Sequence, residues 1–143
     1  MAYKKQKTRA VAKTLLIYGE GKTEQTFCLF LKEILVERNS GVSVTIESGT
    51  GGGPKELIKK VKGELERRGF DNCVVMMDTD LPWPDPLPKK TNGTRIHYVG
   101  SDPCIEGVFL KLLNDPKYHS SQYSSKKCKS LFHKKYFAMT TEN

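Results

Sequence analysis

No Cys-x-x-Cys pair occurs in this chain of 143 residues, although it contains four cysteines. Zinc knuckles depend on such closely spaced pairs, so their absence disfavours that class of site. Cys28 and Cys73 lie within apolar segments, and we predict reduced, buried thiols at both positions. The alternative is a structural zinc site formed by Cys104, His119, Cys128 and His133.

A long apolar run is also missing. The first fourteen residues carry five lysines or arginines, but no apolar stretch long enough for a signal peptide or a membrane span follows them. Hydrophobic residues make up 37% of the chain and aromatic residues 9%, which suits one ordered globular domain of this length. We therefore expect a cytoplasmic protein with no membrane partner.

Acidic residues are absent from residues 1–14 and from residues 117–137, near the two ends of the chain. Residues 1–14 contain five basic residues and residues 117–137 contain six, whereas residues 15–116 contain thirteen basic and fifteen acidic ones. The net charge of +8 therefore originates in the ends. Basic flanks beside an acidic core suit a protein that binds a phosphate chain. The alternative is that the basic ends are merely solvated.

The C-terminal basic segment interleaves aromatic residues with lysines. Phe132 and Tyr136 share this segment with Lys126, Lys127 and Lys129. Aromatic rings that stack on bases, among lysines that contact phosphates, suit single-stranded nucleic acid, so these three lysines are candidate nucleic-acid-binding residues. Alternatively, the segment is a terminal helix with a core face and a solvated face, because Phe132 and Tyr136 are four residues apart.

Apolar patterning predicts strands that alternate with helices. The predicted strands cover residues 14–18, 42–46, 73–77 and 95–100. Helical patterns between and after them begin at Thr23, Pro54 and Asp102. Crossovers of this length are right-handed and join parallel strands, so the predicted fold class is α/β, with a Rossmann-like parallel sheet flanked by helices. The predicted parts are a basic N-terminal arm (1–13), the α/β domain (14–116) and a basic C-terminal segment (117–143).

Each predicted helix has one apolar face. The first helix places five apolar residues on one stripe: Phe27, Phe30, Leu31, Ile34 and Leu35. The second helix does the same with Leu57, Ile58, Val61 and Leu65. The third helix is expected to have Asp102 as its N-cap, and its apolar face comprises Ile105, Val108, Phe109, Leu112 and Leu113. Four prolines at alternate positions in residues 81–88 predict an irregular, stiff loop.

Acidic residues follow two of the predicted buried strands. Glu20 comes after the first strand, and Asp78 and Asp80 come after the third. Ligands of open α/β sheets bind at the carboxyl ends of the strands, so these carboxylates are expected to converge there. Like charges in contact repel, and a divalent cation removes that repulsion. Carboxylate oxygens with water and phosphate completing the shell predict a magnesium site.

Gly21-Lys22-Thr23 has the ending of a P-loop, but the motif requires a glycine where this chain has Leu16. A carboxylate at Glu20 would also repel a cradled phosphate, so we reject a P-loop here. Lys22 is instead a candidate contact to the scissile phosphate, or else a solvated lysine at a helix start. Glu106, near the start of the third helix, is a candidate fourth carboxylate ligand; alternatively it only helps to cap that helix.

Glu20 between two glycines, followed by Asp78-Thr79-Asp80 after the third strand, resembles the Glu and Asp-x-Asp motifs of the TOPRIM fold. Within that fold, Glu20-Gly21-Lys22-Thr23-Glu24 and Ser101-Asp102-Pro103-Cys104-Ile105-Glu106 are similar to segments of the RloB (AbiLii-like) family. Asp102 and Ile105 stand where that family usually has Asn and Phe. The resemblance implies that Asp78 and Asp80 hold Mg²⁺ and that Glu20 is a metal ligand or a general acid/base.

These observations predict a TOPRIM-like nuclease that cleaves nucleic acid phosphodiesters with Mg²⁺, for which Mn²⁺ can substitute. The RloB resemblance implies a role in host or phage defence, with a possible protein partner. Two alternatives stay open: a non-catalytic TOPRIM-fold module that binds nucleic acid and recruits a partner, and a nucleotidyl-transferring enzyme. The sequence does not distinguish RNA from DNA as the substrate.

Overall fold

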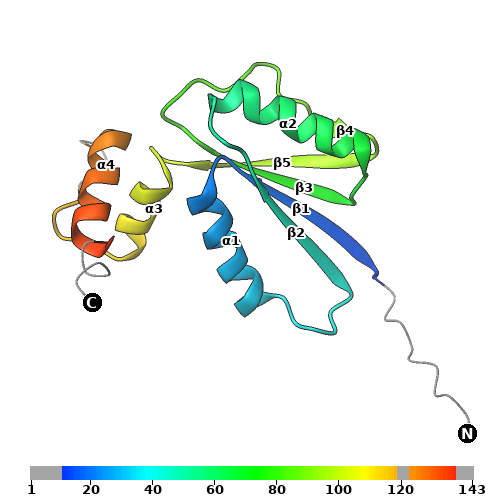
Figure 1. Ribbon diagram of the computed structural model, residues 1–143, viewed down its shortest axis with the longest axis horizontal. Helices are drawn as coiled ribbons and strands as arrows, with labels where there is room; N and C mark the ends of the chain where they lie inside the picture. Colours follow the sequence, from blue (N-terminus) through cyan, green and yellow to red (C-terminus); the bar gives the residue numbers. More distant parts are fainter. Residues whose placement is uncertain (1–10, 119–122, 138–143) are drawn as a thin grey trace, which may run out of the picture.

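The computed structural model describes residues 11–118 and 123–137. These residues form a Rossmann-like α/β fold, in which helices flank a five-stranded, mostly parallel sheet (Figure 1). Most of the predicted basic arm lies outside the described residues, as does His119 of the alternative zinc site. All four cysteines are buried as free thiols. No helix in the described ranges has both the length and the apolar character needed to cross a bilayer.

The strands of the sheet are β1 (Lys13–Gly19), β2 (Val42–Ser48), β3 (Asn72–Asp78), β4 (Lys90–Thr91) and β5 (Thr94–Ser101). Their order across the sheet is β2-β1-β3-β5-β4. β1 pairs in parallel with β2 and β3, and β3 pairs in parallel with β5. The predicted strands and parallel crossovers are therefore confirmed. β4 runs antiparallel to β5 and was not predicted, because two residues are too few to show a period.

The helix α2 (Gly53–Arg67) forms the main core with one face of the sheet. Every residue of its predicted apolar face is buried: Leu57, Ile58, Val61 and Leu65. They pack against alternate residues of the strands, including Leu16, Cys73, Val75, Met77 and Ile96. The prediction for this helix is confirmed, and the loop over residues 81–88 contains no helix or strand, as its prolines predict.

The helix α1 (Lys22–Leu35) lies beside β1 and β2, but its predicted apolar face is wrong (Figure 1). The structure buries Glu24 and Cys28 instead, and leaves Phe30, Ile34 and Leu35 exposed by 57%, 60% and 70%. The reason lies in the tertiary arrangement: on that side of α1 the ring of Phe109 packs against Phe27, while Phe30, Ile34 and Leu35 stay exposed. Periodicity identified a helix but not which side of it meets the sheet.

The helix α3 (Ile105–Leu112) begins later than predicted. Asp102 does not cap it; the Asp102 side chain accepts a hydrogen bond from the Thr79 hydroxyl at 2.7 Å, and Cys104 occupies the N-cap position. Leu112 and Leu113, which were expected to face the core, are exposed. This difference arises because α3 continues beyond the end of β5 and does not fold back over the sheet (Figure 1).

The helix α4 (Ser125–Phe132) and the π-helical turn after it (His133–Phe137) pack with α3 beyond the sheet (Figure 1). Cys104, Leu110 and Cys128 form the buried centre of this second cluster. Phe132 and Tyr136 pack against it. The aromatic residues of the C-terminal segment therefore contribute to a core, as the helical alternative predicts, although α4 still carries exposed lysines.

The two leucines near the C-terminal ends of α1 and α2 provide a matched test of this packing. We expect Leu65→Ala to lower the free energy of unfolding by about 2–5 kcal/mol, because Leu65 is fully buried. Leu35→Ala should change it by less than about 0.5 kcal/mol, because Leu35 is exposed. Urea denaturation of both variants measures the difference, and equal losses would contradict the described placement of α1.

Candidate metal centre

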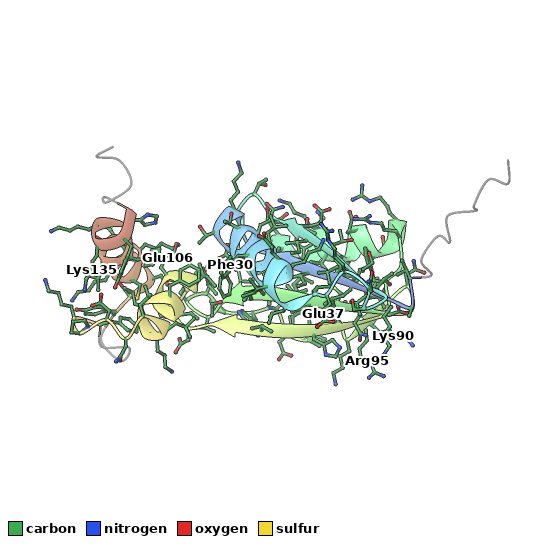
Figure 2. The ribbon with its side chains drawn as sticks, turned by 90° about the horizontal axis from the view of Figure 1, so that it is seen from below. Phe30, Glu37, Lys90, Arg95, Glu106 and Lys135 are labelled. Atoms are coloured by element: carbon green, nitrogen blue, oxygen red, sulfur yellow. The ribbon has the colours of Figure 1, made fainter. Side chains whose placement is uncertain are left out.

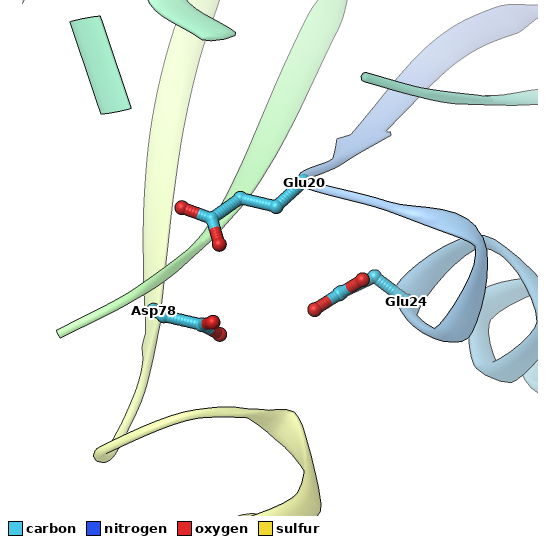
Figure 3. Close-up of side chains that lie close together, drawn as sticks. All are labelled: Glu20, Glu24 and Asp78. Atoms are coloured by element: carbon cyan, nitrogen blue, oxygen red, sulfur yellow. The ribbon is translucent and has the colours of Figure 1, made fainter. Parts of the chain in front are cut away.

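Three carboxylates meet at the carboxyl edge of the sheet. Glu20 directly follows β1, Glu24 lies in the first turn of α1, and Asp78 is the last residue of β3. One oxygen from each lies within 4.8 Å of the other two (Figure 3). Because β1 and β3 are parallel neighbours, their carboxyl ends are side by side, which brings Glu20 to Asp78. This cluster could bind a metal ion.

The position of Glu24 is fixed by the turn that connects β1 to α1. Its carboxylate accepts a hydrogen bond from the backbone amide of Gly21 at 3.0 Å, which satisfies a donor at the start of the helix. The helix also comes unusually close to the strand, since a Cβ atom on Gly19 would lie 2.6 Å from Cβ of Glu24. A side chain at Gly19 would therefore displace Glu24 from the cluster.

Asp78 is buried, and one of its two carboxylate oxygens has no hydrogen-bond partner among the described residues. Only 7% of the residue is exposed, and the oxygen without a partner is Oδ1. Its backbone is held in place, because the indole of Trp83 donates a hydrogen bond to the Asp78 carbonyl at 2.8 Å. A buried carboxylate oxygen without a partner is costly, and either a proton or a cation removes that cost.

The electrostatics of the cluster favour protonation when no cation is bound. Burial, followed by the negative charge of Glu20, raises the pKa of Asp78 from its ordinary 3.8 to about 8. Burial also raises the pKa of Glu20, although hydrogen bonds with Asp78 oppose that shift. Glu20 can hydrogen-bond to the side chain of Asp78 only while one of the two carboxyl groups holds a proton. The pair therefore retains a proton that a cation would replace.

Two of the sequence-predicted acidic residues lie outside the group of three. Asp80 is exposed, because β3 ends at Asp78 and the chain bends at Thr79, whose amide donates to the Ser101 carbonyl at 3.0 Å. Its charge still contributes to the raised pKa values of Glu20 and Asp78. Glu106, in the first turn of α3, is buried, and its Oε2 atom has no hydrogen-bond partner among the described residues.

The sequence-predicted lysines take three different positions. Lys22 is exposed at the start of α1, next in the chain to the cluster. On α4, Lys126 is exposed, and the ammonium group of Lys127 lies 4.3 Å from the ring centre of Tyr123. Lys129 is also exposed, and its pKa is raised, because the lowering by partial desolvation is outweighed by negative charges that include Glu106, Asp78 and Asp80.

Sequence reasoning missed two features of this site. Glu24 was not among the predicted metal ligands, although its place four residues after Glu20 at a helix start was an available signal. Lys129 was assigned to a nucleic-acid-binding surface, and only the packing of α4 against α3 brings it near the acidic residues. No periodicity in the sequence carries that information.

The chain matches no family model, no curated protein and no solved structure. The resemblance to RloB and TOPRIM proteins therefore depends on the motifs alone. The geometry is informative without the resemblance. Glu20, Glu24 and Asp78 each offer one oxygen atom, and a set of oxygen atoms with no histidine or cysteine suits a hard divalent cation.

The raised pKa of Asp78 predicts how stability depends on pH in the absence of divalent cations. The unfolded chain releases this proton near pH 4, whereas the folded chain retains it to about pH 8. The folded state therefore binds more protons in this window, and its stability should fall as pH rises, by up to about 1.4 kcal/mol per pH unit. Asp78→Asn should flatten this part of the profile. Urea denaturation between pH 4 and 8 checks it, and parallel profiles for parent and variant would contradict the burial of an ionisable Asp78.

Proposed function

We propose that this protein is a magnesium-dependent nuclease of the TOPRIM type that cleaves the phosphodiester bonds of nucleic acid. One observation carries the proposal: Glu20, Glu24 and Asp78 converge within 4.8 Å, and a buried oxygen of Asp78 has no partner. A cation would allow all three groups to ionise together. Oxygen ligands alone favour Mg²⁺, with Mn²⁺ as a substitute.

The residues around the cluster have complementary roles in this proposal. Glu20, Glu24 and Asp78 hold the cation, while Asp80 and Glu106 add negative charge to the same region. A bound magnesium ion would neutralise the non-bridging oxygens of a phosphate. Among the three carboxylates that hold the cation, Glu20 is the best candidate for moving a proton, because it is only partly buried and its pKa is raised. Lys22 supplies a positive charge to the phosphate from the exposed start of α1.

The charge distribution and the fold of the C-terminal segment support the choice of nucleic acid as the substrate class. Lys126 and Lys127 are exposed on α4, which places positive charge beyond the acidic edge of the sheet. A phosphate chain crossing that edge would meet the cluster and then α4. The resemblance to the RloB family extends the proposal to phage defence in the cytoplasm, in concert with a protein partner.

We predict that Asp78→Asn abolishes metal-dependent cleavage while preserving the fold, because it removes a charge from a repulsive cluster without creating a cavity. Cleavage of a mixed panel of RNA and DNA in Mg²⁺ and in Mn²⁺, with circular dichroism as the fold check, is the measurement. Glu66→Gln is the matched control, since Glu66 is exposed on α2 and outside the cluster. Cleavage at the parental rate by Asp78→Asn would refute a metal-dependent reaction at this site.

A second candidate is a non-catalytic module that binds nucleic acid and recruits a partner. Its support is electrostatic: the negative charges of Glu106, Asp78 and Asp80 are among those that raise the pKa of Lys129, so a positive side chain already lies in the field of these carboxylates. A built-in cation could stabilise the acidic edge without a metal ion. Binding that is unaffected by a chelator, together with no cleavage in either metal, would support this module over the nuclease.

The salt dependence of binding tests the role of α4 in either candidate. Each phosphate contact on a single strand contributes roughly 0.7 to the slope of log affinity against log salt. Replacing Lys126, Lys127 and Lys129 with glutamine should therefore make the slope shallower by up to about 2. The control replaces three exposed lysines of α2: Lys55, Lys59 and Lys62. Equal slopes for the parent and the α4 variant would exclude these lysines from the interface.

A further inference from the structure

A pocket of about 530 Å³ opens between α1 and the α3–α4 pair, within the range of small-ligand sites. Its walls on the α1 side are Phe27 and Phe30, with Lys22, Thr23 and Thr26 providing polar groups. Figure 2 shows Phe30 on the side of α1 that faces α3. This combination of aromatic surface with a lysine and two hydroxyl groups is unlike the main core, which is aliphatic in its buried part.

The opposite wall consists of rings held by one another. Phe109 of α3 meets Phe27 at 5.1 Å between ring centres and 66° between planes, and Phe132 of α4 lies 5.3 Å from Phe109. Such contacts fix the rings without covering the remaining ring, Phe30, which is more than half exposed. The pocket is therefore a preformed aromatic slot with one accessible ring at its mouth.

The slot adjoins the metal centre through α1. Lys22 and Thr23 lie in the chain between Glu20 and Glu24, so the first turn of the helix serves both sites. Glu24 is directed to Asp78, while Thr23, Thr26 and Phe27 line the slot. A phosphate at the metal centre would thus have Lys22 beside it and an aromatic surface immediately beyond.

We propose that this slot binds a nucleobase of single-stranded nucleic acid whose phosphate lies at the metal centre, which rests on the proposed function. Aromatic side chains stack on every base, and Lys22 complements the attached phosphate. A paired base is already stacked in its duplex, so the slot selects unpaired nucleotides. A second copy of the chain is a poorer occupant, because two molecules with a net charge of +8 repel each other.

Phe30 provides the test, because its exposed ring can be removed at little cost to folding. Fluorescence anisotropy of labelled single-stranded RNA and DNA oligonucleotides, in Ca²⁺ to limit cleavage, measures binding to the full chain. Phe30→Ala should weaken binding roughly 5- to 150-fold, the range for losing one stacked base, whereas Phe30→Trp should retain it. Ile34→Ala, one turn further along α1 and equally exposed, should change affinity less than about twofold.

An abasic scan identifies the base in the slot. Removing one particular base should weaken binding to the parent by the same factor, and should not weaken binding to Phe30→Ala further. Parental affinity in Phe30→Ala, or equal sensitivity of both proteins at every abasic position, would overturn the slot and leave the nuclease proposal standing. If Phe30→Ala and one abasic position weaken binding non-additively, and no cleavage occurs in Mg²⁺, the slot is supported and the nuclease is refuted. The absence of any binding to the oligonucleotides would also overturn the slot. So would a dimer of the protein that Phe30→Ala dissociates without changing the affinity for nucleic acid.

Discussion

Repulsion among Glu20, Glu24 and Asp78 is the constraint on which the functional edge of this protein depends. Two unit charges about 4 Å apart repel by about 4 kcal/mol at an effective dielectric of 20, a large part of the stability of a small domain. The three oxygens lie within 4.8 Å of one another, and burial raises the pKa of Asp78 to about 8. The folded chain therefore needs either a proton or a cation at this edge. The repulsion that destabilises the empty cluster also gives the cluster its affinity for a metal ion.

The surrounding structure holds the carboxylates together despite that repulsion. The register of the sheet pairs Gly19 with Met76, so β3 extends two residues beyond the paired end of β1 and presents Asp78 beside the turn that carries Glu20. Gly19 leaves space for Glu24, and the Trp83 indole fixes the Asp78 carbonyl at 2.8 Å. The main core packs α2 on the sheet that carries this edge, while α1 connects the edge to the aromatic slot.

The sequence predicts the sheet and α2 well, because buried strands and a helix packed on one face have clear periods. It predicts that Glu20 and Asp78 converge, since carboxyl ends of parallel strands share an edge. It fails for the exposed face of α1 and for the start of α3, because both depend on α3 leaving the sheet to pack with α4. Glu24 was missed although Glu20 lies only four residues before it, whereas the proximity of Lys129 to the acidic residues arises from packing between elements that the sequence does not reveal.

Anomalous scattering from crystals grown with Mn²⁺ tests the metal centre most directly, because it locates the ion without reference to activity. The predicted result is one strong peak bound by oxygens of Glu20, Glu24 and Asp78, at roughly 2.1 Å as expected for a small divalent cation. A Mn²⁺ peak elsewhere, or none at this edge at a pH above 8, would contradict the central claim that these carboxylates form a cation site.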